Sequence, residues 1–159
     1  GIFKCIDLDQ AYRAIQWKSL IMIVGMLPFA IALERTGGVD LAAHALVGLT
    51  ANTGVYSMLA LLFAITVALG LFVSGTANAV LLIPVALAIA EELQASPYPF
   101  AMTVALACSS SFMTPIAPVN SLVATAGNYS FADFLRIGLP LTLIVLVVSV
   151  LMVPWIFPL

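Results

Sequence analysis

Charged residues are scarce in this chain, and their scarcity limits what the protein can be. Five Lys or Arg and seven Asp or Glu occur among 159 residues, whereas 64% of the residues are hydrophobic. The mean hydropathy of +1.21 lies far above the range of soluble globular domains. The composition therefore predicts an integral membrane protein in contact with the lipid bilayer. Because the net charge is −2 and no basic cluster exists, we expect no nucleic-acid partner.

Cysteine is also rare, and the two cysteines are far apart. Cys5 precedes the first apolar segment and Cys108 lies inside a later one, which suits neither a disulfide framework nor a metal site. No His, carboxylate or Cys/His pair is placed to form a catalytic set, so the sequence predicts a protein that is not an enzyme. The chain opens at Gly1 without the apolar core and cleavage site of a signal peptide, and we expect it to be the later part of a longer protein.

Long apolar segments are abundant and predict an all-α membrane protein. A membrane helix needs about 20 mostly apolar residues. We expect Pro28 to kink the first segment and Trp155 to lie at the membrane boundary near the end of the last. The apolar segments cover residues 19–33, 56–73, 77–90, 101–112 and 134–157.

Two polar stretches separate some of these segments. Residues 37–49 predict a short amphipathic helix near the membrane interface, with Asp40 and His44 on one side. For His44 we expect an interfacial polar contact rather than a role in proton transfer. Glu91 and Glu92 fit a solvated helix end, and "ASPYPF" at 95–100 predicts an interfacial loop.

The few positive residues orient the chain in the membrane. Because positive residues favour the cytoplasmic side, we expect the first and last spans to begin there. The two segments between 56 and 90 then enter from the outer side and return to it. Arg35, next to Glu34, is an exception on the outer side. The residues that set this orientation are Lys4, Arg13, Lys18 and Arg136.

Polar residues interrupt the apolar segments at two places, "SGTAN" at 74–78 and "TPIAPVN" at 114–120. Backbone that leaves a helix inside a membrane is tolerated only where it is buried in protein or lines a watery cavity. Pro115 and Pro118 lack the backbone N–H that a continuing helix needs. Paired interruptions indicate the binding site of a secondary transporter. A polar turn and a Pro-kinked helix without any ligand would give the same pattern, so both interpretations remain open.

The residue types at these interruptions suit ion binding. The hydroxyls of Ser74, Thr76 and Thr114, with carbonyls freed by the prolines, are hard oxygen ligands for a small cation. Helices that begin after each interruption would favour an anion at their N-termini. Asn78 is either a further ligand or the donor of a hydrogen bond between helices.

Three stretches carry a resemblance to a known family: "SGTANAVLLIPVALAIAEEL", "SPYPFAMTVALACSSSFMTPIAPVNSLV" and "YSFADFLRIGLPLTL". They resemble the C-terminal half of the divalent anion/sodium symporter (DASS) family, part of the ion transporter superfamily. "AIQWKSLIMIVGMLPFAIALERTGG" is similar to the opening span of the family's second repeat. The resemblance implies that residues 1–159 form one inverted-repeat half with a re-entrant helical hairpin and a broken transmembrane helix. It also implies a missing N-terminal repeat and a homodimer.

The family carries a Ser-Asn-Thr signature at its hairpin tip, and here Ser74, Gly75 and Thr76 occupy that place. The resemblance implies sodium between the tip and the broken helix, with an anionic substrate beside it. Gly75 replaces the signature Asn, which removes an amide side chain but keeps a carbonyl. The implied sodium ligands are Ser74, Gly75, Thr76, Asn78, Thr114, Ala117 and Asn120. The implied substrate-binding residues are Ser74, Gly75, Thr76, Pro118 and Asn120.

We therefore expect sodium-coupled secondary transport of a small divalent anion, a dicarboxylate or sulfate, across an inner (plasma) membrane. No Lys or Arg lies within the interruptions, so helix N-termini and hydroxyls would hold the anion. An ion antiporter or metalloid-oxyanion permease of the same superfamily is the first alternative. It would be expected to use a membrane-buried carboxylate, which residues 56–90 and 101–127 lack. A non-transporting membrane module, without sodium dependence, is the second.

Overall fold

The computed structural model describes residues 15, 17–50, 54–115 and 118–158, and this part of the chain is built from α-helices. Two of them, α5 and α8, are long and apolar enough to cross a membrane, and α2 and α3 pass the same test as a pair bent by 69°. The predicted all-α membrane fold is confirmed. The helices are α2 (Trp17–Arg35), α3 (Gly38–Thr50), α4 (Val55–Gly70), α5 (Gly75–Glu92), α6 (Pro97–Ser109), α7 (Pro118–Gly127) and α8 (Phe131–Ile156).

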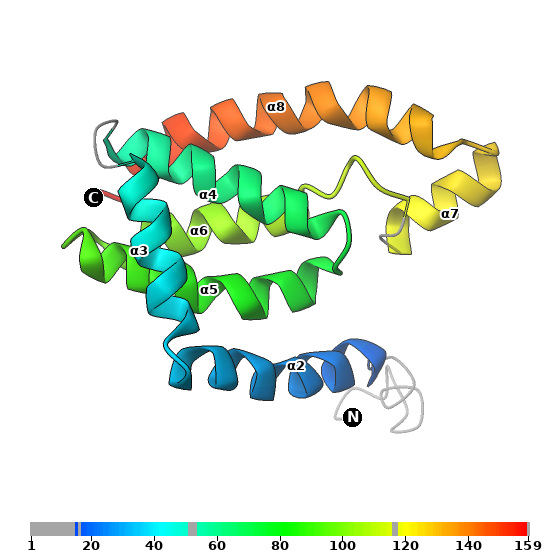
Figure 1. The fold of residues 1–159 in the computed structure, drawn as a ribbon. Helices are drawn as coiled ribbons and strands as arrows, with labels where there is room; N and C mark the ends of the chain where they lie inside the picture. Colours follow the sequence, from blue (N-terminus) through cyan, green and yellow to red (C-terminus); the bar gives the residue numbers. More distant parts are fainter. Residues whose placement is uncertain (1–14, 16, 51–53, 116–117, 159) are drawn as a thin grey trace, which may run out of the picture.

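Helices α4, α5 and α6 run side by side and form the centre of the molecule (Figure 1). Helices α4 and α5 make a helical hairpin, whose turn lies at the same end of the bundle as the C-terminal end of α6. Helix α8 packs on α4 and α6, whereas α2 packs on α5. Both helices of the hairpin therefore pack against other helices, and α8 extends beyond the end of the bundle at which the turn lies (Figure 1).

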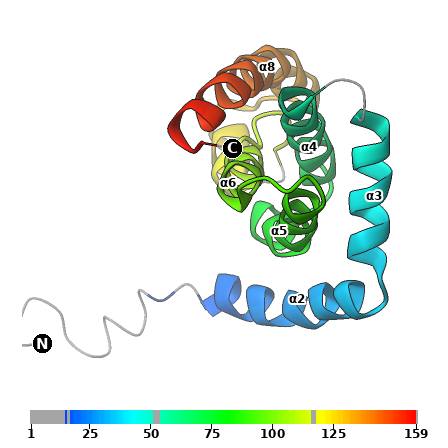
Figure 2. The same ribbon diagram turned by 90° about the vertical axis from the view of Figure 1, so that its left-hand side faces the viewer.

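Helix α3 lies across the bundle, at the end where α4 begins and α5 ends (Figure 2). It is joined to α2 by a short turn at Thr36 and Gly37. Gly37 has φ +73°, a left-handed conformation that glycine adopts without the penalty of a side chain. The helix predicted over 37–49 is thus confirmed as an element, and it packs across the side of α4 and α5 near the open end of the hairpin.

The core consists of apolar side chains from α4, α5 and α6. The two helices of the hairpin bury one part of their apolar surface against α3 and α6, while residues such as Leu69 and Leu87 stay exposed. The outer helices α2 and α8 instead expose large apolar side chains such as Ile21, Phe29, Ile137 and Leu151, as expected of surfaces that face lipid or further protein. The fully enclosed core residues are Leu59, Leu62, Phe63, Ala86, Ile89, Phe100 and Val104.

The interfacial loop predicted at 95–100 is wrong. Helix α6 begins at Pro97, because proline suits the first helical position, where no intrahelical N–H is needed. Phe100 is completely buried between the central helices, and Tyr98 is the aromatic residue that stays exposed. Pro28 lies inside α2, which is assigned as one helix from Trp17 to Arg35.

Candidate functional site

The hairpin turn covers residues 71–74 and is displaced from the interruption predicted at 74–78. Helix α5 begins at Gly75, so Thr76 and Asn78 are helical. Ser74 is the N-cap residue, with the extended backbone (φ −64°, ψ 147°) that this position usually adopts. The polar residues after the turn were therefore the start of a helix, and the sequence pattern placed the turn a few residues too late.

Gly75 brings the hairpin into contact with the end of α6. A Cβ atom at this position would lie 2.7 Å from the backbone oxygen of Cys108, closer than side-chain carbons come to a carbonyl. Because that neighbour is backbone and not a flexible side chain, only glycine fits without movement. The glycine in the signature position thus has a packing role that the sequence did not reveal.

The second interruption is also displaced. Helix α6 ends at Ser109 instead of Phe112, and α7 begins at Pro118, so the non-helical segment (described residues 110–115) starts earlier than predicted. At this end of α6, Ser109 donates to the carbonyl of Ala105 at 2.9 Å and Ser110 to that of Leu106 at 2.7 Å. Pro118, placed inside the interruption by the sequence pattern, occupies the first helical position of α7.

Asn120, in the first turn of α7, forms hydrogen bonds with two backbone carbonyls of the non-helical segment. Its Nδ2 donates to the carbonyl of Ser111 at 2.7 Å and to that of Thr114 at 2.8 Å. Thr114 is 1% exposed, so this part of the backbone is enclosed in protein. Two of the predicted site residues, Thr114 and Asn120, are therefore brought together.

The hairpin and the non-helical segment adjoin at Ser111. Its hydroxyl lies 3.9 Å from the position that a Cβ of Gly70 would occupy, and its carbonyl accepts the Asn120 bond. Together with the contact between Gly75 and Cys108, this places the two predicted interruptions next to each other. Paired interruptions that adjoin within a helical bundle are the arrangement expected of a transporter site.

The hydroxyls of Ser74 and Thr76 lie on the α2 side of the hairpin. Their oxygens are 3.5 Å apart, and Ser74 Oγ is 3.7 Å from the sulfur of Met22 in α2. Both residues are exposed, and their described hydrogen bonds do not reach Thr114 or Asn120. The described structure therefore brings the Gly75 backbone to α6 but leaves these two hydroxyls facing α2.

Asn78 forms a hydrogen bond between helices. Its Nδ2 donates to the backbone carbonyl of Thr66 in α4 at 2.7 Å, and the residue is 1% exposed. The sequence left two interpretations open for Asn78, an ion ligand or a hydrogen bond between helices, and the structure shows the hydrogen bond. Ala117 lies outside the described residues, as does the side chain of Pro118.

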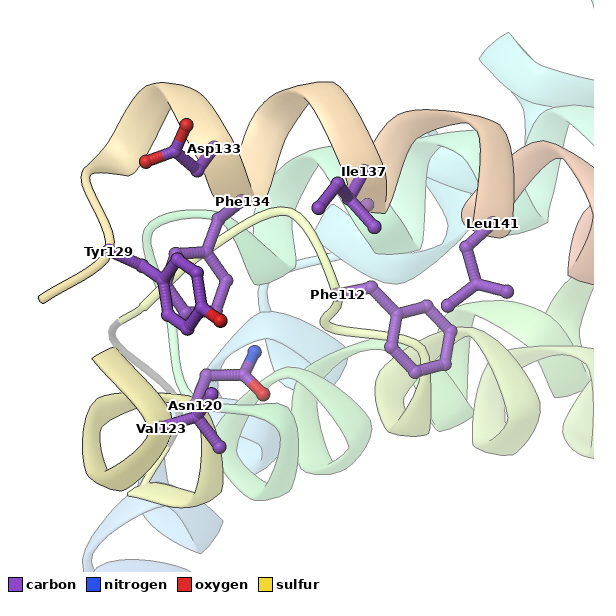
Figure 3. Close-up of a pocket in the computed structure, with 9 residues that line it drawn as sticks. Phe112, Asn120, Val123, Tyr129, Asp133, Phe134, Ile137 and Leu141 are labelled. Carbon is purple, nitrogen blue, oxygen red and sulfur yellow. The ribbon is translucent and has the colours of Figure 1, made fainter. Parts of the chain in front are cut away.

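A pocket of about 310 Å³ lies between the non-helical segment, α7 and α8 (Figure 3). Helix α8 approaches the segment closely at Gly138, where a Cβ would be 2.5 Å from the carbonyl oxygen of Phe112. The lining is mainly apolar and contains the Asp133 carboxylate but no Lys or Arg, so it does not suit a divalent anion. This pocket could not be predicted from the sequence, because its apolar residues come from three separate elements. The lining residues are Phe112, Asn120, Val123, Tyr129, Asp133, Phe134, Ile137, Gly138 and Leu141.

A polar contact joins α3 to the end of α5, away from the two interruptions. His44 Nδ1 and Glu92 Oε1 are 2.7 Å apart, with side-chain exposures of 70% and 28%. Glu92 is therefore paired and not simply solvated as the sequence suggested, whereas His44 makes the polar contact expected of it. In the described residues no group of three or more His, Cys, Asp or Glu side chains could hold a metal ion.

A helical hairpin packed among other helices, a second helix interrupted beside its turn and long apolar helices around them are typical of an integral membrane protein of the transporter class. The sequence matches the citrate transporter family over residues 1–105 and again over residues 50–159, and the chain belongs to that family. It is thus a member of a transporter family and not an enzyme, in line with its resemblance to transporters of the ion transporter superfamily.

Individual relatives support the same class. The chain is 53% identical to the uncharacterized transporter YfbS of Escherichia coli, over 99% of this chain and 26% of that protein. It is 34% identical to the uncharacterized transporter sll0640 of Synechocystis, over 98% of this chain and 26% of that protein. It is 28% identical to the probable sodium/sulfate cotransporter 3 of Chlamydomonas reinhardtii, over 91% of this chain and 16% of that protein. The chain therefore spans about a quarter of the length of the first two relatives.

Proposed function

We propose that the intact protein couples the movement of sodium to the transport of a small divalent anion, and that residues 1–159 supply the C-terminal half of its binding site. The observation that carries this proposal is the meeting of the hairpin with the non-helical segment at Ser111, which is held between Gly70 and Asn120. Non-helical backbone at such a place supplies oxygen atoms and helix ends directed at one region. Sodium coupling is supported by the Chlamydomonas relatives named sodium/sulfate cotransporters.

Neutral oxygen atoms would bind the sodium ion in this proposal. The candidates are the hydroxyls of Ser74 and Thr76 and backbone carbonyls of the hairpin turn and the non-helical segment. The carbonyls of Ser111 and Thr114 each accept a bond from Asn120, yet a carbonyl oxygen has two lone pairs and can also contact an ion. Because Ser74 and Thr76 face α2, their participation requires the ion to sit on that side of the tip.

Helix N-termini would hold the anion. The sequence has no Lys or Arg between Arg35 and Arg136, so no cationic side chain of this half of the site can neutralise the anion. Helices α5 and α7 both begin next to the proposed site, and the partial positive charge at their first turns favours an anion. Bound sodium would add positive charge beside it, so each ligand should raise the affinity of the other by the same factor.

Sulfate is the first candidate substrate and a dicarboxylate is the second. The test is uptake of labelled sulfate and labelled succinate into proteoliposomes that contain the intact protein, with sodium titrated against choline. We expect uptake that saturates with sodium, with half-saturation at lower sodium when more anion is present. Uptake that is indifferent to sodium would overturn the proposal and favour an antiporter, an oxyanion permease or a non-transporting module.

The remaining parts of the proposal concern the setting of the protein. On the family resemblance we place the intact protein in the plasma membrane as a homodimer with an additional, N-terminal repeat. Cross-linking of the protein in native membranes tests the dimer, and fractionation of those membranes tests the location. A monomer in the cross-linking experiment would contradict the first of these statements.

A further inference from the structure

Each interruption in the helical backbone is bridged by an asparagine from the helix that follows it. Asn78 is the fourth residue of α5 and donates across the hairpin turn to the carbonyl of Thr66, twelve residues earlier. Asn120 is the third residue of α7 and donates across the non-helical segment to the carbonyls of Ser111 and Thr114, nine and six residues earlier. The two bridges are alike in residue type and in direction, and both asparagines lie within the first four residues of their helix.

The bridges use the nitrogen side of each amide. A primary amide has two N–H donors on nitrogen and an oxygen that accepts. In Asn120 the single Nδ2 faces two carbonyls, at 2.7 and 2.8 Å, so both donors are used. A carbonyl in the low-dielectric interior of a membrane protein loses much stability when its donor is removed. These bonds join protein groups alone and require no ion.

From this geometry we infer that Asn78 and Asn120 are positioning residues, which hold the hairpin turn and the non-helical segment in place through their N–H groups. The inference rests on the proposed function in one respect: the backbone that they hold is the backbone that would bind sodium. It departs from the expectation that both residues are direct sodium ligands. The two roles differ in the half of the amide that matters, oxygen for a ligand and nitrogen for a positioning residue.

Asn78→Asp and Asn120→Asp separate these roles, because aspartate keeps the oxygen and loses both donors. If the asparagines were ligands, a carboxylate in their place would keep or raise sodium affinity. If they position the backbone, the variants lose hydrogen bonds and place a negative charge against carbonyl oxygens. We then expect the sodium concentration for half-maximal uptake to rise about tenfold in Asn78→Asp, which corresponds to the loss of roughly one hydrogen bond, and to rise further in Asn120→Asp, which loses two.

Two matched variants serve as controls. Thr66→Val removes a hydroxyl that bonds within α4, to the carbonyl of Leu62, and keeps the backbone carbonyl that Asn78 binds. Thr125→Ala removes a hydroxyl that bonds within α7, to the carbonyl of Ser121. We expect both controls to keep the sodium dependence of the unmodified protein. A control that shifts as far as the Asp variants would contradict a specific role of the two amides.

Thermal unfolding in sodium-free buffer gives a second measurement. Because the bridges need no ion, Asn78→Ala and Asn120→Ala should lower the melting temperature of the purified intact protein without sodium. Loss of a pure ligand would leave that temperature unchanged and remove only the increase caused by sodium. This measurement decides the matter if an Asp variant does not fold.

The outcomes distinguish this inference from the proposed function. If the unmodified protein shows no sodium dependence, the proposed function fails, while sodium-free melting still tests the bridges. If the unmodified protein depends on sodium but the Asp variants keep its affinity, the positioning role alone is wrong. Unchanged sodium-free melting of both Ala variants would also overturn it.

Discussion

Replacing Gly75 with alanine tests whether the hairpin contacts α6 as closely as the structure shows. The added Cβ would lie 2.7 Å from the carbonyl oxygen of Cys108, whereas carbon–oxygen contacts in proteins are usually no shorter than about 3.3 Å. The hairpin and α6 must therefore separate by about 0.6 Å. Overpacking of this kind costs roughly 1–3 kcal/mol, against which the better helix propensity of alanine offsets up to about 1 kcal/mol.

We expect Gly75→Ala to destabilise the intact protein by about 1–2 kcal/mol and to weaken sodium dependence, because the tip leaves the non-helical segment. Gly75→Asn, which restores the residue of the family signature, meets the same oxygen with a larger side chain and should be more damaging. Chemical and thermal unfolding of purified protein measure the first effect, and sodium-titrated uptake measures the second.

Gly70→Ala is the matched control, since Gly70 also lies in the hairpin and faces the same region. Its Cβ would be 3.4 Å from Nδ2 of Asn78 and 3.9 Å from Oγ of Ser111, distances close to ordinary contact. We expect this variant to be neutral or slightly stabilised. If Gly75→Ala is as stable and as sodium-dependent as Gly70→Ala, the close approach to Cys108 is wrong.

Three further predictions concern other contacts. Gly138→Ala places a Cβ 2.5 Å from the Phe112 carbonyl and should destabilise the protein as Gly75→Ala does; an unchanged melting temperature would show that α8 does not press on that segment. A double-mutant cycle with His44→Ala and Glu92→Ala should give a coupling energy of about 0.2–1 kcal/mol, typical of exposed pairs, and additive effects would show that the 2.7 Å contact adds nothing. Phe72→Cys, at a turn residue that is 83% exposed here, should resist impermeant thiol reagents from the cytoplasmic side if the turn lies within the membrane; strong labelling in every state would contradict the re-entrant hairpin.

The helices could be predicted from the sequence because long apolar segments leave few alternatives. The ends of the two interruptions could not. Serine, threonine and asparagine look the same in a sequence whether they leave a helix or begin one. Helix α6 ends at Ser109, before the predicted Phe112, and Asn78 lies inside α5 although it resembles a turn residue.

Contacts between distant residues explain the other errors. The contact of Glu92 with His44 could not be predicted, because His44 lies 48 residues away on another helix. Phe100 follows two prolines, a pattern typical of interfacial loops, yet those prolines begin a helix that carries it into the core. A glycine in an apolar helix gives no signal of the carbonyl that it meets, so the roles of Gly75 and Gly138 came from the structure alone.

The packing of the hairpin against other helices has a consequence for how the protein is made. Its turn, residues 71–74, leaves the helix and so has backbone groups that would be costly against lipid, and the helices that pack on the hairpin include α6 and α8. Both of those helices leave the ribosome after the hairpin does, because chains are synthesised from the N-terminus. The nascent hairpin therefore has to wait, in water or at the insertion machinery, until at least the residues of α8 have emerged. Truncations placed before and after Phe131 should thus differ sharply in whether the hairpin enters the membrane.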